Sequence, residues 1–302
     1  MERASKSEID GSYSGPNQRT AFMVPIYGGL GNQMFQVAHA LARAEDRRAT
    51  AKFVDLTAAR GNVSRNWELE CFGIHRTRLS AAATGALRLR MTLSRKLYRF
   101  GGANGLGVYH ERFFPQEPAF YQSARAYAGY WQGERFFASA EETVRKAFQF
   151  RPELSRPSDF DPGLKNSVAV HVRRGDYVSD PKARARHLVC DSDWYIGAIE
   201  QMRSHLDQPT FFVFSDDPDW ADKALCTKSD VHIIRNSPSA PAWIDMALMA
   251  QCAHFIISNS SYSWWAAYLG KSTDSLTIAP ANWHPGVPTD SLPIHCPDWT
   301  LL

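Results

Sequence analysis

The stretch His171-Val-Arg-Arg-Gly-Asp-Tyr177 begins inside an apolar run that starts at Ser167. The alternation within this run predicts a buried strand. In an open α/β sheet, ligands bind beyond the carboxyl ends of the strands. Two adjacent guanidinium groups at such an end suit a doubly charged ligand with planar oxygens, such as a diphosphate. Gly175 permits the sharp turn and close backbone approach that such a site needs.

Arg173 and Arg174 also have a simpler interpretation, a surface pair with Asp176 as its ion-pair partner. Most surface charges are merely solvated, which favours that alternative for an arbitrary arginine pair. The position directly after a predicted buried strand favours a ligand-binding pair instead.

Strands and helices alternate regularly beyond this stretch. Further strands are predicted at 210–214, 231–234, 254–257 and 276–279, and helices at 192–206, 218–225, 241–251 and 262–269. Strands separated by short helical patterns are typical of a parallel, doubly wound sheet.

The N-terminal half begins with a predicted strand at 21–27, the loop Gly28-Gly-Leu-Gly-Asn-Gln-Met34, a helix at 32–46 with Asn32 as N-cap, and a strand at 51–55. A glycine loop at a helix start brings backbone N–H groups close to an anion or a sugar. A nicotinamide or flavin site is an alternative. Its motif is only partly matched, because Met34 replaces the third glycine, although Asp55 lies near the place of the ribose acid.

The segment between these halves is less regular. A helix is predicted at 79–100, with a basic side that is either a solvated face or an anion- or membrane-facing surface. A strand at 126–131, a helix at 134–150 and a proline-containing linker at 151–166 follow.

Composition limits the functional classes. The 302 residues are 44% hydrophobic and 22% charged, which suits a well-cored protein of two domains, and the net charge of +3 favours no nucleic-acid partner. Five scattered cysteines without a Cys-x-x-Cys pair predict reduced thiols in a cytosolic protein. No apolar run reaches about 18 residues, so no stable membrane span is expected. Residues 1–20 lack the apolar core of a signal peptide and are expected to be a disordered lead.

Three predicted strand ends carry polar residues: His171–Asp176, Ser215–Asp217 and Ser258–Ser261. Hydroxyls and N–H groups at a helix start suit phosphate oxygens, whereas carboxylates suit a base amino group or a ribose hydroxyl. Taken alone, the aspartates before Pro218 resemble a helix cap. Together the three ends predict a nucleoside-diphosphate site. No metal is expected, because the adjacent aspartates lack Asp-x-Asp spacing and the arginines supply the charge a cation would provide.

Four blocks of the sequence resemble the bacterial α-1,2-fucosyltransferases of glycosyltransferase family 11. They are Gly28-Gly-Leu-Gly-Asn-Gln-Met-Phe-Gln36, His171-Val-Arg-Arg-Gly-Asp-Tyr177, Phe214-Ser-Asp-Asp217 and Ile257-Ser-Asn-Ser-Ser-Tyr-Ser-Trp-Trp265. A further block, Gly129-Tyr-Trp-Gln-Gly-Glu134, has Gly133 where the family more usually has serine.

The resemblance implies an α/β fold of the GT-B type, with two Rossmann-like domains, a cleft between them and a parallel sheet in the C-terminal domain. The expected domains are an acceptor-side domain at 21–155 and a GDP-sugar-binding domain at 156–302. The implied activity is inverting, metal-independent transfer of L-fucose from GDP-β-L-fucose to the 2-hydroxyl of a terminal galactose. The acceptor would be a galactose-terminated oligosaccharide or lipid-linked glycan, and no cofactor is expected.

The same resemblance implies roles for individual residues. Arg173 and Arg174 would hold the diphosphate, Asn32 would close the cleft over donor and acceptor, and Asp176 is the candidate general base, with orientation of an arginine as its alternative role. The expected substrate-binding residues are Gly29, Gly31, Asn32, Gln33, His171, Arg173, Arg174, Asp216, Asp217, Asn259, Ser260 and Ser261.

Three alternatives stay open at this point. They are a fucosyltransferase of another linkage or acceptor, a non-catalytic nucleotide-sugar or glycan-binding protein on the same fold, and a nicotinamide oxidoreductase. A cytoplasmic location is expected, with peripheral association to the inner membrane left open.

Overall fold

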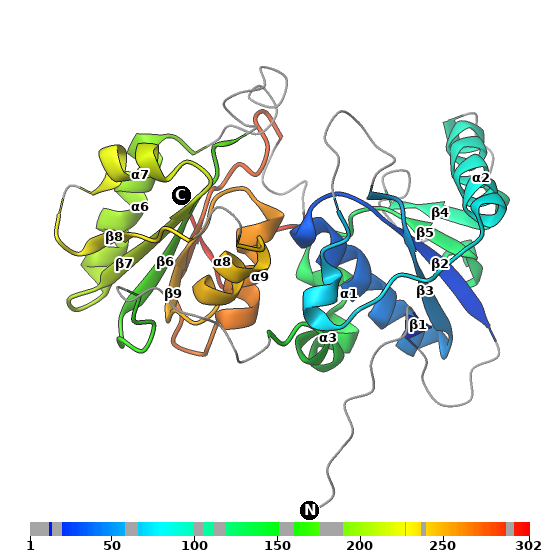
Figure 1. The fold of residues 1–302 in the computed structure, drawn as a ribbon, viewed down its shortest axis with the longest axis horizontal. Helices are drawn as coiled ribbons and strands as arrows, with labels where there is room; N and C mark the ends of the chain where they lie inside the picture. Colours follow the sequence, from blue (N-terminus) through cyan, green and yellow to red (C-terminus); the bar gives the residue numbers. More distant parts are fainter. Residues whose placement is uncertain are drawn as a thin grey trace, which may run out of the picture. The chain divides into compact units, whose positions relative to one another are not determined.

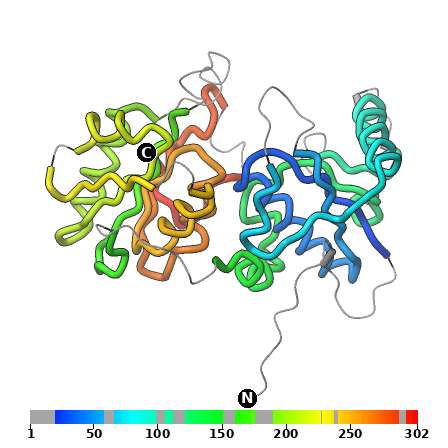
Figure 2. Tube along the Cα trace, in the orientation of Figure 1, coloured from blue at the N-terminus to red at the C-terminus, as the bar shows by residue number. Residues whose placement is uncertain are grey.

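The structure is a computed structural model that describes residues 12–13, 20–57, 66–99, 105–111, 119–150, 160–175, 190–226, 228–236, 240–287 and 293–302 (Figures 1 and 2). The chain divides into two compact units, Met1–Gln149 and Phe150–Leu302. The boundary expected between residues 155 and 156 stays a prediction, because residues 151–159 lie outside the described residues.

The first unit contains a five-stranded sheet in the order β1-β3-β2-β5-β4. Its strands are β1 (Ser12–Tyr13), β2 (Ala21–Ile26), β3 (Thr50–Asp55), β4 (Val108–His110) and β5 (Ala126–Ala128). β2 to β5 are parallel, whereas β1 pairs antiparallel with β3 and lies in the lead that was expected to be disordered. The helices are α1 (Leu30–Arg47), α2 (Ala81–Arg99) and α3 (Glu141–Ala147), and 3₁₀ turns lie at Leu69–Phe72, Gly105–Gly107, Ala119–Ser123, Glu134–Phe136 and Ala138–Ala140.

The β2–loop–α1–β3 unit predicted from the sequence is present, and α1 is buried along most of its length. The prediction of Asn32 as the helix N-cap is wrong. The chain turns at Gly28, whose φ of +86° favours glycine, so α1 begins earlier and its N-cap is Gly29. Asn32 therefore lies in the first turn, where its side chain is available to contact another segment.

Two further predictions in this unit are wrong. The strand predicted to reach residue 131 ends at Ala128, and Trp131, with a φ of +56°, is not in a strand conformation. The single helix predicted at 134–150 is two 3₁₀ turns followed by the short helix α3. Phe137 breaks it with φ −143° and ψ 11°, a conformation that lets its side chain enter the core completely.

The second unit contains a six-stranded sheet in the order β11-β10-β9-β6-β7-β8, with every pair parallel. Its strands are β6 (Ser167–Val172), β7 (Thr210–Ser215), β8 (Val231–Ile233), β9 (His254–Ile256), β10 (Thr277–Ala279) and β11 (Thr300–Leu301). Its helices are α6 (Ser192–His205), α7 (Pro218–Leu225), α8 (Trp243–Met249) and α9 (Ser261–Gly270). Two α/β units with parallel strands confirm the predicted Rossmann-like, GT-B-type fold class.

The centre of this second sheet is β6, which is buried at all six positions. Val168, Val170 and Val172 pack with Tyr195 and Ile199 of α6 in one apolar cluster, and each such side chain contributes about 1.5–3 kcal/mol when fully buried. Figure 1 shows α6 and α7 on one side of the sheet and α8 and α9 on the other. This packing holds the carboxyl end of β6 in a fixed place between its neighbours.

Candidate functional site

Three polar strand ends come together at one edge of the second sheet, as the sequence predicts. β6 lies between β7 and β9, with Val172 opposite Ser215 and Val170 opposite Ile256. Because all three strands are parallel, the residues that follow them emerge at the same edge. The arginine pair, the aspartate pair and the Ser258–Ser261 segment are therefore neighbours.

The arginine pair is held by the aspartates that follow β7. Arg173 forms an ion pair with Asp216 through Nη1 and Oδ2, and the other oxygen of Asp216 accepts the Arg174 backbone N–H at 2.8 Å. The Nε of Arg174 donates to Asp217 at 3.1 Å, and its guanidinium lies 3.9 Å from the ring centroid of Trp220. Both guanidinium groups are only partly exposed, so the carboxylates and the indole fix where they point.

These contacts give Asp216 and Asp217 a second interpretation. The sequence predicts that one of them reads the base or ribose of a nucleotide, and that remains a prediction. Asp217 is also the N-cap of α7, accepting the Trp220 N–H at 3.2 Å. Asp176, the predicted base and the alternative partner of the arginines, lies outside the described residues.

Gly175 is required for the approach of Asp216 to the backbone. A Cβ atom at this position would lie 2.6 Å from Asp216 Oδ2 and 3.3 Å from its Cγ. Any larger residue would therefore push the carboxylate away from Arg173. Gly175 thus permits a close ion pair, while its predicted role in the approach of a ligand stays a prediction.

His171 is buried beside this site, and its predicted contact with the substrate stays a prediction. Its side chain is 7% exposed, its Nδ1 is 3.0 Å from the Ser258 hydroxyl and its ring packs against Tyr262. Burial lowers the pKa of His171 to about 4; the charge of Asp216 opposes this shift and that of Arg173 adds to it. The imidazole is therefore neutral near neutral pH and links β6 to the segment after β9.

This pKa predicts an acid-sensitive fold. Unfolded chains protonate histidine below about pH 6.5, whereas folded His171 takes up its proton only near pH 4. Its contribution to stability is thus complete above about pH 6.5 and is lost as the pH falls toward 4. We expect the difference in melting temperature between pH 7 and pH 5 to shrink in His171→Gln. The same change at exposed His205 is the control, and an unaltered difference in His171→Gln would contradict the expectation.

The third strand end places its residues around the start of α9. Ser260 is the N-cap, and its hydroxyl accepts the Tyr262 N–H at 3.3 Å. Ser261 is the first residue of the helix and is half-buried. Asn259 is buried and donates through Nδ2 to the Trp283 carbonyl at 3.1 Å, which indicates a structural task for its amide.

In the first unit, two buried glutamines fix the glycine loop. Gln36 holds both backbone groups of Tyr27, accepting its N–H at 3.0 Å and donating to its carbonyl at 2.8 Å. Gln33 donates to the carbonyls of Gly28 and Asn66 and accepts the Glu68 N–H. Gln33 was predicted to bind substrate, but its amide is fully buried and engaged by the protein itself.

The other predicted residues of this loop differ in accessibility. Gly29 is half-buried, and a Cβ built on it would meet no atom within 4 Å. Gly31 is buried in the first turn of α1. Asn32 is half-buried, and its Oδ1 accepts from Gln132 Nε2 at 2.7 Å. Asn32 is thus the side chain of this loop that is best placed to meet a ligand.

Glu111 supports the turn that carries Gln132, and no prediction was made for it from the sequence. It follows β4, and its Oε2 accepts the backbone N–H groups of Tyr130 and Trp131 at 2.8 and 3.0 Å. Burial raises the pKa of the Glu111 carboxyl, against the lowering effect of these two N–H groups and of Arg135. A Cβ on Gly129 would lie 2.5 Å from Glu111 Oε2. Gly129 is therefore the sequence signal that the Glu111 carboxylate approaches the backbone closely here.

Trp131 completes the arrangement. Its indole stacks on the buried His39 ring at 3.8 Å with an interplanar angle of 5°. Glu111 and this stack together hold the turn in which Gln132 reaches Asn32. Among the described residues, no group of three histidine, cysteine or acidic side chains is arranged to hold a metal ion.

Comparisons with known proteins agree with one another. Residues 108–300 match the family model of glycosyl transferase family 11. An α-1,2-colitosyltransferase of Escherichia coli is 31% identical over 271 residues, covering 85% of this chain and 90% of that protein. The O-antigen biosynthesis glycosyltransferase WbnK of Escherichia coli is 29% identical over 287 residues, covering 86% and 94%. The human galactoside α-(1,2)-fucosyltransferase 1 is 30% identical over 145 residues, covering 44% and 40%.

Proposed function

The chain belongs to glycosyl transferase family 11, and from this premise we propose that it is a galactoside α-1,2-L-fucosyltransferase. It moves fucose from GDP-β-L-fucose to the 2-hydroxyl of a terminal galactose, with inversion and without a metal ion. The observation that carries the proposal is the pair Arg173 and Arg174, which two aspartates hold at the carboxyl end of the central strand. The α-1,2 names of two relatives support the linkage.

The arginine pair suits the charge changes of this reaction. As the bond between fucose C1 and the phosphate oxygen breaks, negative charge grows on the departing GDP. Donors that are already oriented toward that charge stabilise the transition state more than the ground state. Asp216 pairs with Arg173, and Asp217 and Trp220 contact Arg174, so both guanidinium groups are restrained before a donor binds.

The acceptor side of the reaction needs a proton acceptor. The galactose 2-hydroxyl forms the new bond to fucose C1, and its proton goes to a base or, if the sugar cation is well developed, to water. Asp176 remains our candidate base because it follows the arginines directly in the sequence. Asn32, held by Gln132 in the first unit, is our candidate for a polar contact to the sugars.

A second donor is supported by one specific observation. The relative that matches 85% of the chain is named a colitosyltransferase, and colitose is fucose without its 3-hydroxyl. One missing hydroxyl changes only a few hydrogen bonds of the donor, while the GDP part and its arginine contacts are unchanged. GDP-fucose and GDP-colitose must therefore be compared as donors in the same transfer assay.

Incubation of the purified chain with GDP-fucose and a galactose-terminated oligosaccharide, in EDTA throughout, tests the activity. We expect a fucosylated product in which NMR places fucose on the galactose 2-hydroxyl with the α configuration, the inverse of the β-linked donor. A rate that appears only after manganese is added would contradict metal independence. A higher rate with GDP-colitose would reassign the donor, and no turnover with either would favour the non-catalytic alternative.

Binding of the nucleotide is predicted separately. GDP should raise the melting temperature of the chain, because a ligand that binds only the native state stabilises it by about 2.7 kcal/mol at a hundred times its Kd. UDP and NADH should shift the melting temperature much less, since the base contacts differ. Thermal unfolding with each ligand at the same concentration measures this. A larger shift with NADH would favour a nicotinamide oxidoreductase.

A further inference from the structure

The helix α2 (Ala81–Arg99) carries only positive charge. Its 19 residues contain no aspartate or glutamate. The basic residues are Arg88, Arg90, Arg95, Lys96 and Arg99. Helices on a protein surface commonly mix both signs of charge in pairs three or four residues apart, so a helix with five cations and no acid indicates an anionic partner.

The inner face of α2 fixes how the helix is rotated. Leu87 and Met91 are buried against Val108 and Ala126 of the sheet in one apolar cluster. Ser94 is also buried, and its hydroxyl is 2.7 Å from His110 Nε2. These three positions lie on one side of the helix at spacings of four and three residues. The opposite side therefore faces away from the sheet.

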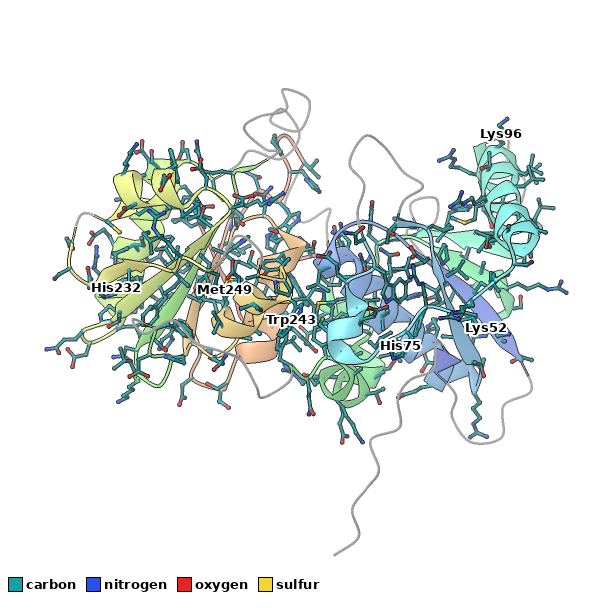
Figure 3. The ribbon with its side chains drawn as sticks, in the orientation of Figure 1. Lys52, His75, Lys96, His232, Trp243 and Met249 are labelled. Carbon is teal, nitrogen blue, oxygen red and sulfur yellow. The ribbon has the colours of Figure 1, made fainter. Side chains whose placement is uncertain are left out.

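That outer side carries a row of leucines. Leu89, Leu93 and Leu97 are 59%, 41% and 43% exposed, and their spacing of four residues aligns them along the helix. Figure 1 shows α2 at the edge of the first unit beside β4, and Figure 3 shows Lys96 projecting from it away from the sheet. The three leucines thus form an aligned apolar row that the packing of the inner face leaves exposed.

Cations occupy the helix face next to this leucine row. At 100° per residue, Lys96 lies directly beside Leu89, whereas Arg88 and Arg95 lie about a quarter of a turn or more beyond it, and all three are exposed. Arg90 lies on the other side and donates to the Leu106 carbonyl at 2.6 Å. An exposed apolar row on one face and arginine and lysine on the next is the pattern of helices that lie in a membrane interface.

We propose that this leucine row and its cations dock the protein on the surface of an anionic lipid bilayer. The leucines enter the boundary between headgroups and acyl chains, and Arg88, Arg95 and Lys96 contact lipid phosphates. A nucleic acid or an acidic protein surface would use the cations but leave the leucines exposed, which is why a bilayer suits the helix better. The described part of the chain has no helix that is long and apolar enough to cross a membrane. The inference does not depend on the proposed function.

Co-sedimentation of the full chain with vesicles tests this docking. We expect binding to vesicles of phosphatidylcholine with phosphatidylglycerol and much weaker binding to phosphatidylcholine alone. Arg88→Gln/Arg95→Gln/Lys96→Gln should weaken binding at least about tenfold, because each basic residue near an anionic surface contributes to attraction. Leu89→Gln/Leu93→Gln/Leu97→Gln keeps every charge and should also weaken binding at least about tenfold through lost apolar burial.

A matched control removes the same charge elsewhere. Lys52, Lys146 and Lys223 are exposed on other elements, and changing all three to glutamine should leave vesicle binding close to that of the unaltered chain. Circular dichroism of each variant checks that the fold is retained, and transfer to a water-soluble acceptor should be unchanged. Equal loss in the lysine control would overturn the proposal. So would unaltered binding of the leucine variant, or binding of heparin that exceeds binding to the vesicles.

Discussion

Replacing Arg173 by alanine is expected to lower kcat for sugar transfer by about a hundredfold or more, the usual effect of losing one donor that stabilises transition-state charge. Its guanidinium is held at the β6 end by Asp216, so under the proposed function it would stabilise the charge of the leaving diphosphate without first having to be ordered. The variant also leaves Asp216 without its cation, which adds repulsion toward the diphosphate. Steady-state kinetics with GDP-fucose measure the change.

The variants around Arg173 make the test specific. Arg174→Lys should be slower than the unaltered chain even though it keeps the positive charge. Lysine offers neither the Nε donor that Asp217 accepts nor a planar group to stack on Trp220. Arg203→Ala is the matched control. It breaks another Arg–Asp pair of the same unit, with Asp230 at the amino end of β8, so it should affect stability and leave kcat nearly unchanged. Wild-type rates in Arg173→Ala would make the pair purely structural.

Asp216→Asn is expected to lower kcat about tenfold to a hundredfold, since a hydrogen bond to a charged group contributes about 1.5–3 kcal/mol. The amide can still accept the Arg174 N–H, but its NH₂ group then faces the Arg173 guanidinium, donor against donor. If Asp216 acts by orienting the arginines, the ratio of GDP to ADP affinity should stay unchanged. If it reads the guanine base, which is one of the two nucleotide contacts that the sequence suggests, the other being the ribose, that ratio should fall.

A double-mutant cycle distinguishes these two roles of Asp216. An orienting role predicts that Asp216→Asn costs little additional rate in a chain that already carries Arg173→Ala, because the group through which it acts is gone. An independent contact with the nucleotide predicts that the two effects multiply. The measurement is kcat of the four proteins, and multiplicative effects would exclude orientation of Arg173 as the main task of Asp216.

Much of the second unit could be predicted from the sequence. Its first five strands are short apolar runs between clear turn and helix signals, so their positions are encoded locally. The sixth, β11 (Thr300–Leu301), was not predicted, because two residues are too short for a recognisable pattern. Once those strands are taken as parallel, their carboxyl ends must meet at one edge, and this consequence alone brings Arg173, Asp216 and Ser260 together. The resemblance to glycosyltransferase family 11 came from residues at these same ends.

The first unit was less predictable for equally physical reasons. β4 is three residues long and has no alternating pattern of useful length. Trp131 and Phe137 leave regular structure because the core takes up their rings, and no local propensity signals such a conformation. Tertiary packing overrides local preference at both places.

The sequence by itself determined the fold class, the edge of the sheet at which the polar strand ends meet and the residue types that gather there. Only the tertiary structure decided which of those residues hold one another. Arg173 pairs with Asp216, 43 positions away, and Asn32 with Gln132, 100 positions away. His171 and Gln33 turn out to be buried. The physical reason is that an ion pair or hydrogen bond depends on atomic positions within a few tenths of an ångström, which strand register and helix packing set and the local sequence pattern does not.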